Sequence, residues 1–394
     1  ICMRRLRRSL SSTRLIRSYN AVSVLRTMYR EGACSKAQIA ELTSMSPATV
    51  TRIVSELLDQ GLVTEDKIAE STGGRKPVIF RLNYEKLYIV GVELVRDRVA
   101  LAICNLKGRI LSKRSFRPYS LEPSDLVAEI AREFDHLLSF NEINKEHILG
   151  VGLAMSGIVD ADAGRLLRSV NLGWRDVDIS GEIENALGFP VVVDNDANAA
   201  ALAEFWFGCA KDVSNFMYIK TDTGVGAGIM SEGRVMTGPR GMAGEIGHVP
   251  VVKGGRECAC GQRGCLETYL YGQGLTRRYE LKTGIHLEDL EDLFERARSG
   301  DPHAEELIDE GAEALVTVAS LAANMADLDL IVIGGLWGTL GDGFLGNVER
   351  ACNEIMERSG LARTLAVRGS ALGEDSDILG AVATVINRWF TPPI

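Results

Sequence analysis

Apolar residues in the N-terminal part of the chain recur at helical spacing in three short segments. The first spans residues 19–32, and its apolar side chains fall on one face of a helix. The second opens with Ser35 and Gln38, a capping-box pattern. The third has Ser46 as its N-cap and Pro47 at the first helical position, and it stops at a glycine. Its predicted buried stripe is Val50, Ile53, Val54, Leu57 and Leu58.

Two strand-like segments follow, residues 62–70 and 77–83, and the sequence STGGRK joins them. Three short helices followed by a hairpin predict a winged helix-turn-helix over residues 19–83, with its third helix suited to the major groove of DNA. A helical dimerisation domain with a charged hairpin is the alternative. The predicted DNA contacts are Ser46, Ala48, Thr49, Thr51 and Arg52 on the third helix, with Arg75 and Lys76 at the hairpin tip.

From residue 87 onward, strand patterns alternate with helical ones. Residues 88–111 have the pattern strand, turn, strand, and a similar layout returns at 216–236, which indicates an internal repeat. Two α/β lobes with a cleft between them are therefore predicted, and such a cleft is a common place for a small ligand. Further strands are expected at 148–154, 190–196 and 329–335, and helices near 124–138, 197–207, 303–326 and 343–358.

The predicted domain organisation follows these changes of pattern. A basic arm at 1–18 precedes the winged domain at 19–83. A first α/β lobe at 87–195 and a second at 196–373 follow. We expect a C-terminal helix at 374–394 to pack back on the first lobe. With 394 residues, two or three domains are the prior expectation for the chain.

The charge is unevenly spread between these parts. Residues 1–90 hold 15 Lys and Arg against 8 Asp and Glu, whereas the remainder holds 29 basic and 45 acidic residues, so that the whole chain carries −9. We call the basic N-terminal part, residues 1–90, the head and the acidic remainder the body. This uneven charge indicates that the head alone binds a polyanion. The arginines of residues 1–18 would either form a further DNA-binding arm or only solvate a disordered start.

The apolar segments of the sequence predict neither a membrane protein nor a secreted one. The longest apolar stretch that matters, residues 314–326, is too short to cross a bilayer and is followed by Asp327 and Asp329. The N-terminal residues contain arginines but no apolar segment, so they do not resemble a secretory signal. We therefore expect a cytoplasmic protein without membrane insertion, in which thiols stay reduced.

Five stretches of the body together resemble the ROK family of sugar kinases and sugar-responsive repressors. They are VVVDNDANAAALAE at 191–204, TGVGAGI at 223–229, GMAGEIGH at 241–248, CACGQRGCLE at 258–267 and IVIGGL at 331–336. The resemblance covers the chain from about residue 87 to its end and implies a two-lobed, actin-like ATPase fold. The winged helix-turn-helix ahead of it resembles the repressor branch of the family.

The resemblance also implies a set of sugar contacts. In the kinases of the family, the aspartate of the Asn-Asp pair acts as base toward a sugar hydroxyl, and Asp196 matches that position. A carboxylate there could accept the proton of the hydroxyl or merely hold it by a hydrogen bond. Carboxylates and amides suit neighbouring hydroxyls, since they bind two at once. The residues that match are Gly157, Asn171, Asn195, Asp196, Glu245, His248 and Glu267.

Three cysteines stand within eight positions, at Cys258, Cys260 and Cys265, and His248 lies ten residues before the first of them. Three cysteines and one histidine form a closed tetrahedral set for structural zinc, with no open position for catalysis. The CxCGxxGC spacing matches the zinc motif of the ROK family, and the two glycines of the loop let it fold around the ion. A redox-active Cys-x-Cys pair is the alternative.

The residues that would bind a nucleotide distinguish a kinase of the family from a repressor. Where the kinases of the family have Asp-x-Gly-Gly-Thr, this chain has ELVRD at 93–97, and Asp222 replaces the first glycine of a Gly-Thr-Gly turn. Side chains and negative charge at these positions would block the approach of backbone amides to phosphate, so we infer that nucleotide binding is lost or very weak. Asp196 would then be a vestigial base that only binds the sugar through a hydrogen bond.

The sequence thus predicts a non-catalytic, sugar-responsive regulator, a repressor of carbohydrate uptake or catabolism genes. It would bind a palindromic double-stranded DNA operator as a homodimer or homotetramer. Sugar would change operator affinity only if it bound the DNA-competent and incompetent states unequally. An ATP-dependent sugar kinase with an attached DNA-binding domain is the alternative, and a regulator that answers to a protein partner is a third possibility.

Overall fold

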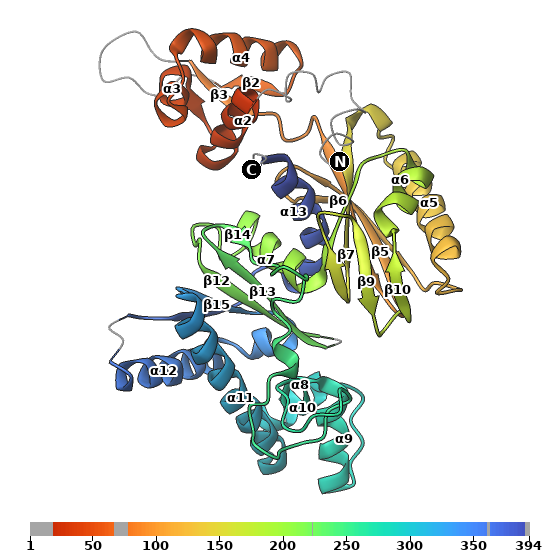
Figure 1. Cartoon of the computed structure of the whole chain (residues 1–394), viewed down its shortest axis with the longest axis vertical. Coiled ribbons are helices and arrows are strands. Elements are labelled where there is room, and N and C mark those ends of the chain that lie inside the picture. The colour runs from red at the N-terminus through yellow and green to blue at the C-terminus, as the bar shows by residue number, and fades with distance from the viewer. Residues whose placement is uncertain (1–18, 67–77, 223, 361–362, 391–394) are drawn as a thin grey trace. The chain divides into compact units, whose positions relative to one another are not determined.

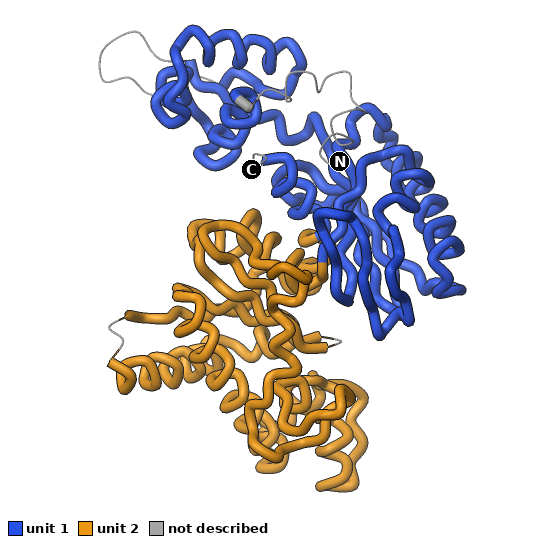
Figure 2. The backbone as a smooth tube through the Cα atoms, viewed as in Figure 1, with its two compact units in different colours: residues 1–194, 381–394 blue, residues 195–380 orange. Residues whose placement is uncertain are grey.

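The computed structural model describes residues 19–66, 78–222, 224–360 and 363–390. The chain forms two compact units, residues 1–194 together with 381–394, and residues 195–380 (Figure 2). The first unit contains the N-terminal head and an α/β lobe, and the second contains another α/β lobe with extra helices. Among the helices in these described ranges, none has the length and apolar character needed to span a bilayer.

The head is a winged helix-turn-helix, as the sequence predicts (Figure 1). The capping box of α3 is formed by Ser35 and Gln38, and the Ser46 side chain caps α4 by accepting from the Thr49 amide. A short strand that the sequence pattern did not indicate, β1, completes a sheet of order β1-β3-β2. The elements are α2 (Tyr19–Glu31), β1 (Cys34–Ser35), α3 (Lys36–Thr43), α4 (Pro47–Asp59), β2 (Val63–Asp66) and β3 (Ile79–Leu82).

The lobe of the first unit is built on a five-stranded sheet of order β11-β7-β4-β5-β6. Its first three strands form an antiparallel meander, and β7 then pairs parallel to β4. Strands β4 and β7 are buried almost throughout, which is why they read as continuous apolar runs. The strands are β4 (Tyr88–Val95), β5 (Arg98–Asn105), β6 (Ile110–Phe116), β7 (Ile148–Met155) and β11 (Val191–Asn195).

Two helices and a small second sheet complete this lobe. Helices α5 (Pro123–Phe140) and α6 (Ile179–Leu187) contribute Leu126, Ile130, Phe134 and Ile183 to one core with the strands. A three-stranded sheet of order β10-β9-β8, which the sequence pattern did not predict, lies between β7 and α6 in the chain. It consists of β8 (Ile158–Asp160), β9 (Arg165–Ser169) and β10 (Trp174–Val177).

The second unit repeats the strand order of the first. Its sheet runs β14-β13-β12-β15-β16, again an antiparallel meander of three strands followed by two parallel ones, which confirms the repeat predicted from the sequence. The strands are β12 (Phe216–Thr221), β13 (Val225–Ser231), β14 (Arg234–Val235), β15 (Leu330–Ile333) and β16 (Ala366–Gly369), and the helices are α7 (Asp196–Trp206), α8 (Glu267–Leu270), α9 (Gly272–Thr283), α10 (Leu290–Arg298), α11 (Pro302–Ala326) and α12 (Asp342–Arg358).

The last helix, α13 (Ser376–Phe390), begins in the second unit and ends in the first. In the first unit its backbone lies so close to β7 that a Cβ atom on Gly152 would stand 1.7 Å from the carbonyl oxygen of Ala381. At its end, the Phe390 ring lies 5.2 Å from the ring of Tyr29 in the head. The Tyr29 hydroxyl donates to the carbonyl of Leu106 in the lobe at 2.8 Å. Head, lobe and C-terminal helix are therefore packed together.

We expect Gly152→Ala to destabilise the protein by about 3 kcal/mol, because the added methyl group would push α13 off β7. The matched control is Gly343→Ala in α12, where nothing lies within 4 Å of the added carbon and alanine is the better helix former. Urea unfolding of the full chain, followed by circular dichroism, measures both. Equal midpoints for the two variants would contradict the close backbone contact.

Candidate functional site

Asp196 stands at the junction of β11 and α7. Its neighbour Asn195 is the N-cap of α7, and the Asn195 side-chain oxygen accepts from the amides of Ala197 and Asn198 at 2.9 and 3.3 Å. Asp196 is therefore the first residue of the helix, where backbone amides and the helix dipole favour a negative charge. Its side chain is largely buried and accepts from the Ala197 amide at 3.0 Å.

Lys220 connects Asp196 to two further carboxylates. This lysine lies on β12 with its side chain 5% exposed, and its ammonium is 3.5 Å from Asp196 Oδ2 and 3.7 Å from Asp222 Oδ2. It also donates to Asp377, in the first turn of α13. We call Lys220, Asp196, Asp222 and Asp377 the Lys220 cluster; all four belong to the second unit.

The three carboxylates raise the pKa of Lys220, although burial alone would lower it. The ammonium is therefore charged at neutral pH. Since the pKa is higher in the folded state than the usual 10.4 or so, this ion pairing contributes stability that is fully present at neutral pH. It is lost only as the pH rises above the ordinary lysine range.

Glu245, His248 and Glu267 form a second polar group in the same unit. Gly247 brings their loop against β13, because a Cβ atom there would stand 2.1 Å from the carbonyl oxygen of Val225. The Glu267 carboxylate accepts from the Val225 amide at 3.4 Å. Burial raises the pKa of Glu245; the charge of His248 opposes this, while Asp196 and Glu267 add to it. The structure thus brings Asp196, Glu245, His248 and Glu267 into one electrostatic neighbourhood.

Gly157 and Asn171 lie in the first unit. Gly157 has a φ of +132°, and a Cβ atom there would stand 2.5 Å from the carbonyl oxygen of Arg168, so the fold itself requires this glycine. Asn171 is exposed, and its amide donates to Ser156, the residue before Gly157, at 3.5 Å. The Asn171 carbonyl accepts from Arg96 at 2.8 Å. These two sequence-predicted contacts are therefore neighbours.

The hairpin that carries ELVRD uses its charged residues within the first unit. Glu93 is buried and pairs with Arg98 at 2.5 Å. Arg96 is held by the Asn171 carbonyl, as described. The hairpin thus carries charged side chains with partners in the first unit on either side of the turn between β4 and β5.

His248, Cys258, Cys260 and Cys265 form a cluster that could hold a metal ion, since one ligand atom from each lies within 4.8 Å of all the others. The His248 Nδ1 atom is 3.8 Å from the Cys258 sulfur, and the sulfurs of Cys260 and Cys265 are 3.7 Å apart. Gly261 and Gly264 both adopt positive φ, as expected for a loop that folds around an ion. His248 is thus oriented with its Nδ1 edge toward the cysteines.

Burial raises the pKa of the Cys258 thiol, and it raises that of Cys265 to about 12. Both thiols need a nearby cation to be thiolates at neutral pH. The pKa of Cys260 is instead lowered, chiefly by a backbone hydrogen bond from Gln262. This donor set suits a metal ion, because thiolates form where a cation replaces the protons.

Comparison with protein families identifies the family to which the two α/β lobes belong. The ROK family model matches residues 89–388. The chain belongs to the ROK family. A MarR family model matches residues 18–70, within the winged head that precedes the ROK body. The fold is therefore a winged helix-turn-helix followed by the two-lobed, actin-like ROK fold.

Relatives of this ROK protein include repressors and kinases. A xylose repressor of Caldicellulosiruptor bescii is 29% identical over 96% of this chain and 98% of its own. A glucokinase of Halalkalibacterium halodurans is 32% identical, over 74% of this chain and 93% of its own. A solved ROK family transcriptional regulator, described as a homologue of the E. coli MLC protein, has 25% identity and a TM-score of 0.82, covering 94% of this chain and 96% of that one.

The head of this ROK protein presents the start of α4 to solvent. Ser46, Ala48, Thr51 and Arg52 are exposed, and Thr49 is half-buried because it packs beside the Ser46 cap. Arg52 pairs with Glu56 one turn later at 2.9 Å. Arg75 and Lys76, the predicted contacts of the wing, lie outside the described residues, as does the basic arm at 1–18.

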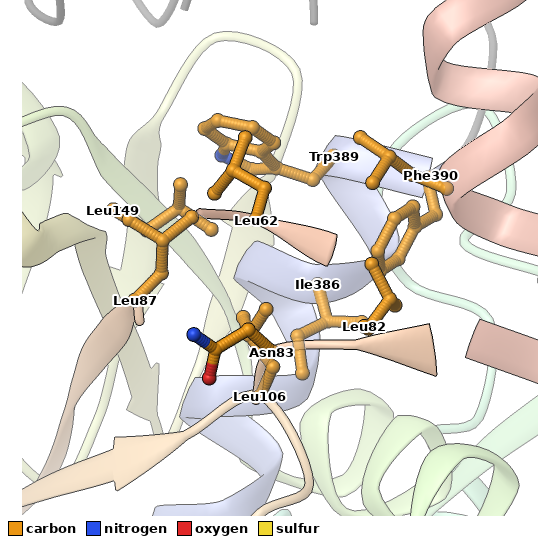
Figure 3. A pocket seen from close by; sticks show the side chains of 10 residues that line it. Leu62, Leu82, Asn83, Leu87, Leu106, Leu149, Ile386, Trp389 and Phe390 are labelled. Atoms are coloured by element: carbon orange, nitrogen blue, oxygen red, sulfur yellow. The ribbon is translucent and has the colours of Figure 1, made fainter. Parts of the chain in front are cut away.

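An apolar cavity lies where the head meets the lobe of the first unit (Figure 3). Asn83 is the polar residue in its wall, and its amide donates to the Gly61 carbonyl at 3.0 Å. None of the sequence-predicted sugar contacts lines this cavity, which belongs to the packing of the head against α13. Its lining is Leu25, Leu62, Leu82, Asn83, Leu87, Leu106, Leu149, Ile386, Trp389 and Phe390.

Sequence reasoning missed the roles of Lys220 and Asp377. The signal was present for the lysine, since it interrupts the apolar strand FMYIKT, and a buried lysine is almost always paired. No local signal identifies Asp377, because it follows Lys220 by 157 residues in the chain. Only the fold brings the two together.

We expect Lys220→Met to destabilise the protein by about 3–5 kcal/mol, because it leaves three neighbouring carboxylates without their cation. Lys220→Arg, which keeps the charge, should lose less. The matched control is Lys253→Met, at an exposed position of the same unit. Urea unfolding at pH 7 measures all three. A Lys220→Met variant as stable as the control would show that the cluster contributes no net stability.

Proposed function

We propose that this ROK protein is a sugar-responsive, DNA-binding transcriptional regulator that represses genes of carbohydrate uptake or catabolism. The observation that carries the proposal is the combination of a winged helix-turn-helix head with a ROK body, matched over nearly its whole length by a xylose repressor. Such a protein works in the compartment that holds the chromosome, which agrees with the cytoplasm expected from the sequence.

The head would read a double-stranded DNA operator with the exposed start of α4. Ser46, Ala48, Thr49, Thr51 and Arg52 offer small and hydroxylated side chains with one guanidinium, a set suited to the major groove. In the wing, Arg75 and Lys76 would contact phosphate or the minor groove. A palindromic operator calls for two heads, so we propose a homodimer or homotetramer.

The body would bind a sugar through the residues predicted from the sequence. Asp196, Glu245 and Glu267 supply carboxylates as acceptors for hydroxyl groups, and His248 supplies a ring nitrogen. Asn195, Asn171 and Gly157 complete the proposed set. The neighbourhood of the four second-unit side chains supports this part of the proposal.

We propose that the His248, Cys258, Cys260 and Cys265 cluster binds structural zinc. Zinc–sulfur bonds of about 2.3 Å in a tetrahedron place sulfurs about 3.8 Å apart, and the Cys260 and Cys265 sulfurs are separated by 3.7 Å. Four protein ligands leave no open position for catalysis. When bound, the ion would fix the loop that carries His248 and Glu267, contributing on the order of 10 kcal/mol to its order.

An ATP-dependent sugar kinase with an attached DNA-binding domain is the second candidate. The glucokinase relative and the retained Asp196 favour it. The hairpins argue against it, because Val95, Arg96 and Asp222 carry side chains at positions where the kinase motifs have glycines that let backbone amides approach a nucleotide phosphate. We therefore favour the regulator.

A mobility-shift assay on the DNA upstream of the protein's own gene tests the regulator. Run at fixed salt with a panel of unphosphorylated and phosphorylated sugars, it should show a retarded complex that at least one sugar releases. Arg52→Ala should weaken operator binding about tenfold or more, since a specific arginine contact is worth about 1–3 kcal/mol. Arg234→Ala, which removes an exposed arginine from the second unit outside the cysteine loop, is the charge-matched control.

An assay of ATP-dependent sugar phosphorylation on the same protein preparation tests the kinase alternative. If the protein phosphorylates any sugar in the panel, and if Asp196→Asn abolishes this activity, the regulator proposal is overturned in favour of the kinase. Operator binding that no sugar alters would instead point to a protein effector.

Zinc content tests the metal site. Wild-type protein purified without chelator should carry about one zinc per chain, and Cys260→Ser should carry at least tenfold less, because three ligands hold the ion far more weakly than four. Cys209→Ser, outside the cluster, should keep the metal. Elemental mass spectrometry measures the content. Equal zinc in the two variants would overturn the assignment.

A further inference from the structure

Helix α4, which is proposed to enter the major groove, is not basic. It contains one basic residue, Arg52, and two acidic ones, Glu56 and Asp59. The described part of the winged domain, residues 19–66 and 78–83, has a similar balance, with five basic side chains against six acidic ones. Because general attraction to the phosphate backbone depends on positive charge, α4 adds little to it. What α4 can supply is direct contact with base edges.

Arg52 is the side chain of α4 best suited to such a contact. The hydroxyls of Ser46 and Thr49 already engage each other at 2.9 Å, at the N-cap of the helix. The Arg52 side chain is 61% exposed, and its Nη1 donates to Glu56 Oε1 at 2.9 Å. A guanidinium has five N–H donors in a rigid fork. The bond to Glu56 uses one of them, so the others can reach a base.

Glu56 is anchored on the side away from this guanidinium. Its side chain is 32% exposed, yet its second oxygen, Oε2, is buried. Among the residues that the structure describes, none donates a hydrogen bond to that oxygen. A buried carboxylate oxygen without a donor costs stability, and its position calls for an explanation. Glu56 is thus a partly buried anchor one turn from Arg52, rather than a fully solvated surface charge.

The pair restricts Arg52 without adding positive charge to the helix. An arginine loses rotamer freedom when it docks on a base, and a guanidinium that a carboxylate already holds loses less. The same carboxylate offsets the charge of Arg52 toward distant phosphates. The pair therefore favours discrimination between sequences over affinity for DNA in general. In the major groove, guanine presents two acceptors, N7 and O6, to such a fork of donors.

We propose that Glu56 is a specificity-determining residue that orients Arg52 to read a guanine in the operator. Arg52 makes the base contact, and Glu56 is a positioning residue that acts through it. The inference rests on the proposed DNA-binding function and names the base that α4 recognises.

Replacement of single guanines by 7-deazaguanine, which lacks the N7 acceptor, tests the contact. The duplex is the shortest fragment upstream of the protein's own gene that the protein retards, and each guanine is replaced in turn. We expect at least one replacement to weaken wild-type binding about tenfold; we call this factor the guanine sensitivity. Arg52→Lys, which keeps the charge and loses the fork, should abolish it. A wild-type protein that is insensitive at every guanine overturns the inference.

Glu56→Met tests the positioning role. It keeps the length of the side chain, replaces a buried oxygen that lacks a donor, and removes the partner of Arg52. Guanine sensitivity should fall about threefold or more, whereas affinity for a scrambled duplex should rise about twofold, because a negative charge is lost. Asp59→Asn, at an exposed position of the same helix, should raise that affinity equally and leave guanine sensitivity unchanged. Equal guanine sensitivity in the two variants would falsify the role of Glu56.

Glu56→Asp guards against a Glu56→Met protein that does not fold. It keeps the negative charge, and its shorter side chain withdraws the carboxylate from Arg52. It should lower guanine sensitivity at unchanged affinity for the scrambled duplex, and an unchanged sensitivity counts against the positioning role. The mobility shift also separates the two levels of the argument. Operator binding with the same guanine sensitivity in every Glu56 variant overturns this inference and keeps the regulator, whereas a protein that retards no DNA overturns both.

Discussion

A single buried ammonium, that of Lys220, is the interaction on which the second unit most depends. It joins the end of β12, the start of α7 and the start of α13, which are far apart in the chain. A buried charge of this kind is costly unless its partners are in place, so the three elements are stable in this arrangement only together. The conformation of Asp196, and with it the proposed sugar contact, depends on that arrangement.

The second constraint is the close backbone packing of α13 in the first unit. Gly152 lets the helix lie directly on β7, and Phe390 at its end reaches Tyr29 of the head. The same helix carries Asp377 in its first turn. A residue of the Lys220 cluster and a residue packed on the DNA-binding head therefore belong to one continuous helix. The proposed effector site and the head share this element of secondary structure.

Features that depend on local chemistry were predictable from the sequence. The capping box at Ser35, the N-cap at Ser46 and the repeated strand layout all follow from short-range pattern, and the structure has each of them. The His248 and cysteine cluster was also visible, because its spacing alone allows the ligands to meet.

Features that depend on distant partners were not predictable in this way. Strand β1 has two residues and exists only because β3 pairs with it. The small sheet between β7 and α6 has weak alternation, and the partnership of Lys220 with Asp377 crosses 157 residues. For Gly157, the sequence suggested a ligand contact, whereas the structure adds a backbone requirement that no pattern of residue types reveals.

The path of α13 has a consequence for biosynthesis. Most of the first unit precedes the second unit in the chain, yet its core includes Val385 and Ile386, which are synthesised only after the whole of the second unit. The second unit likewise receives Asp377 long after Lys220, its partner, has been synthesised. Domains usually fold in order as they are made, but here neither unit can be completed before α13 has been synthesised. A nascent chain that stops short of α13 lacks a part of both.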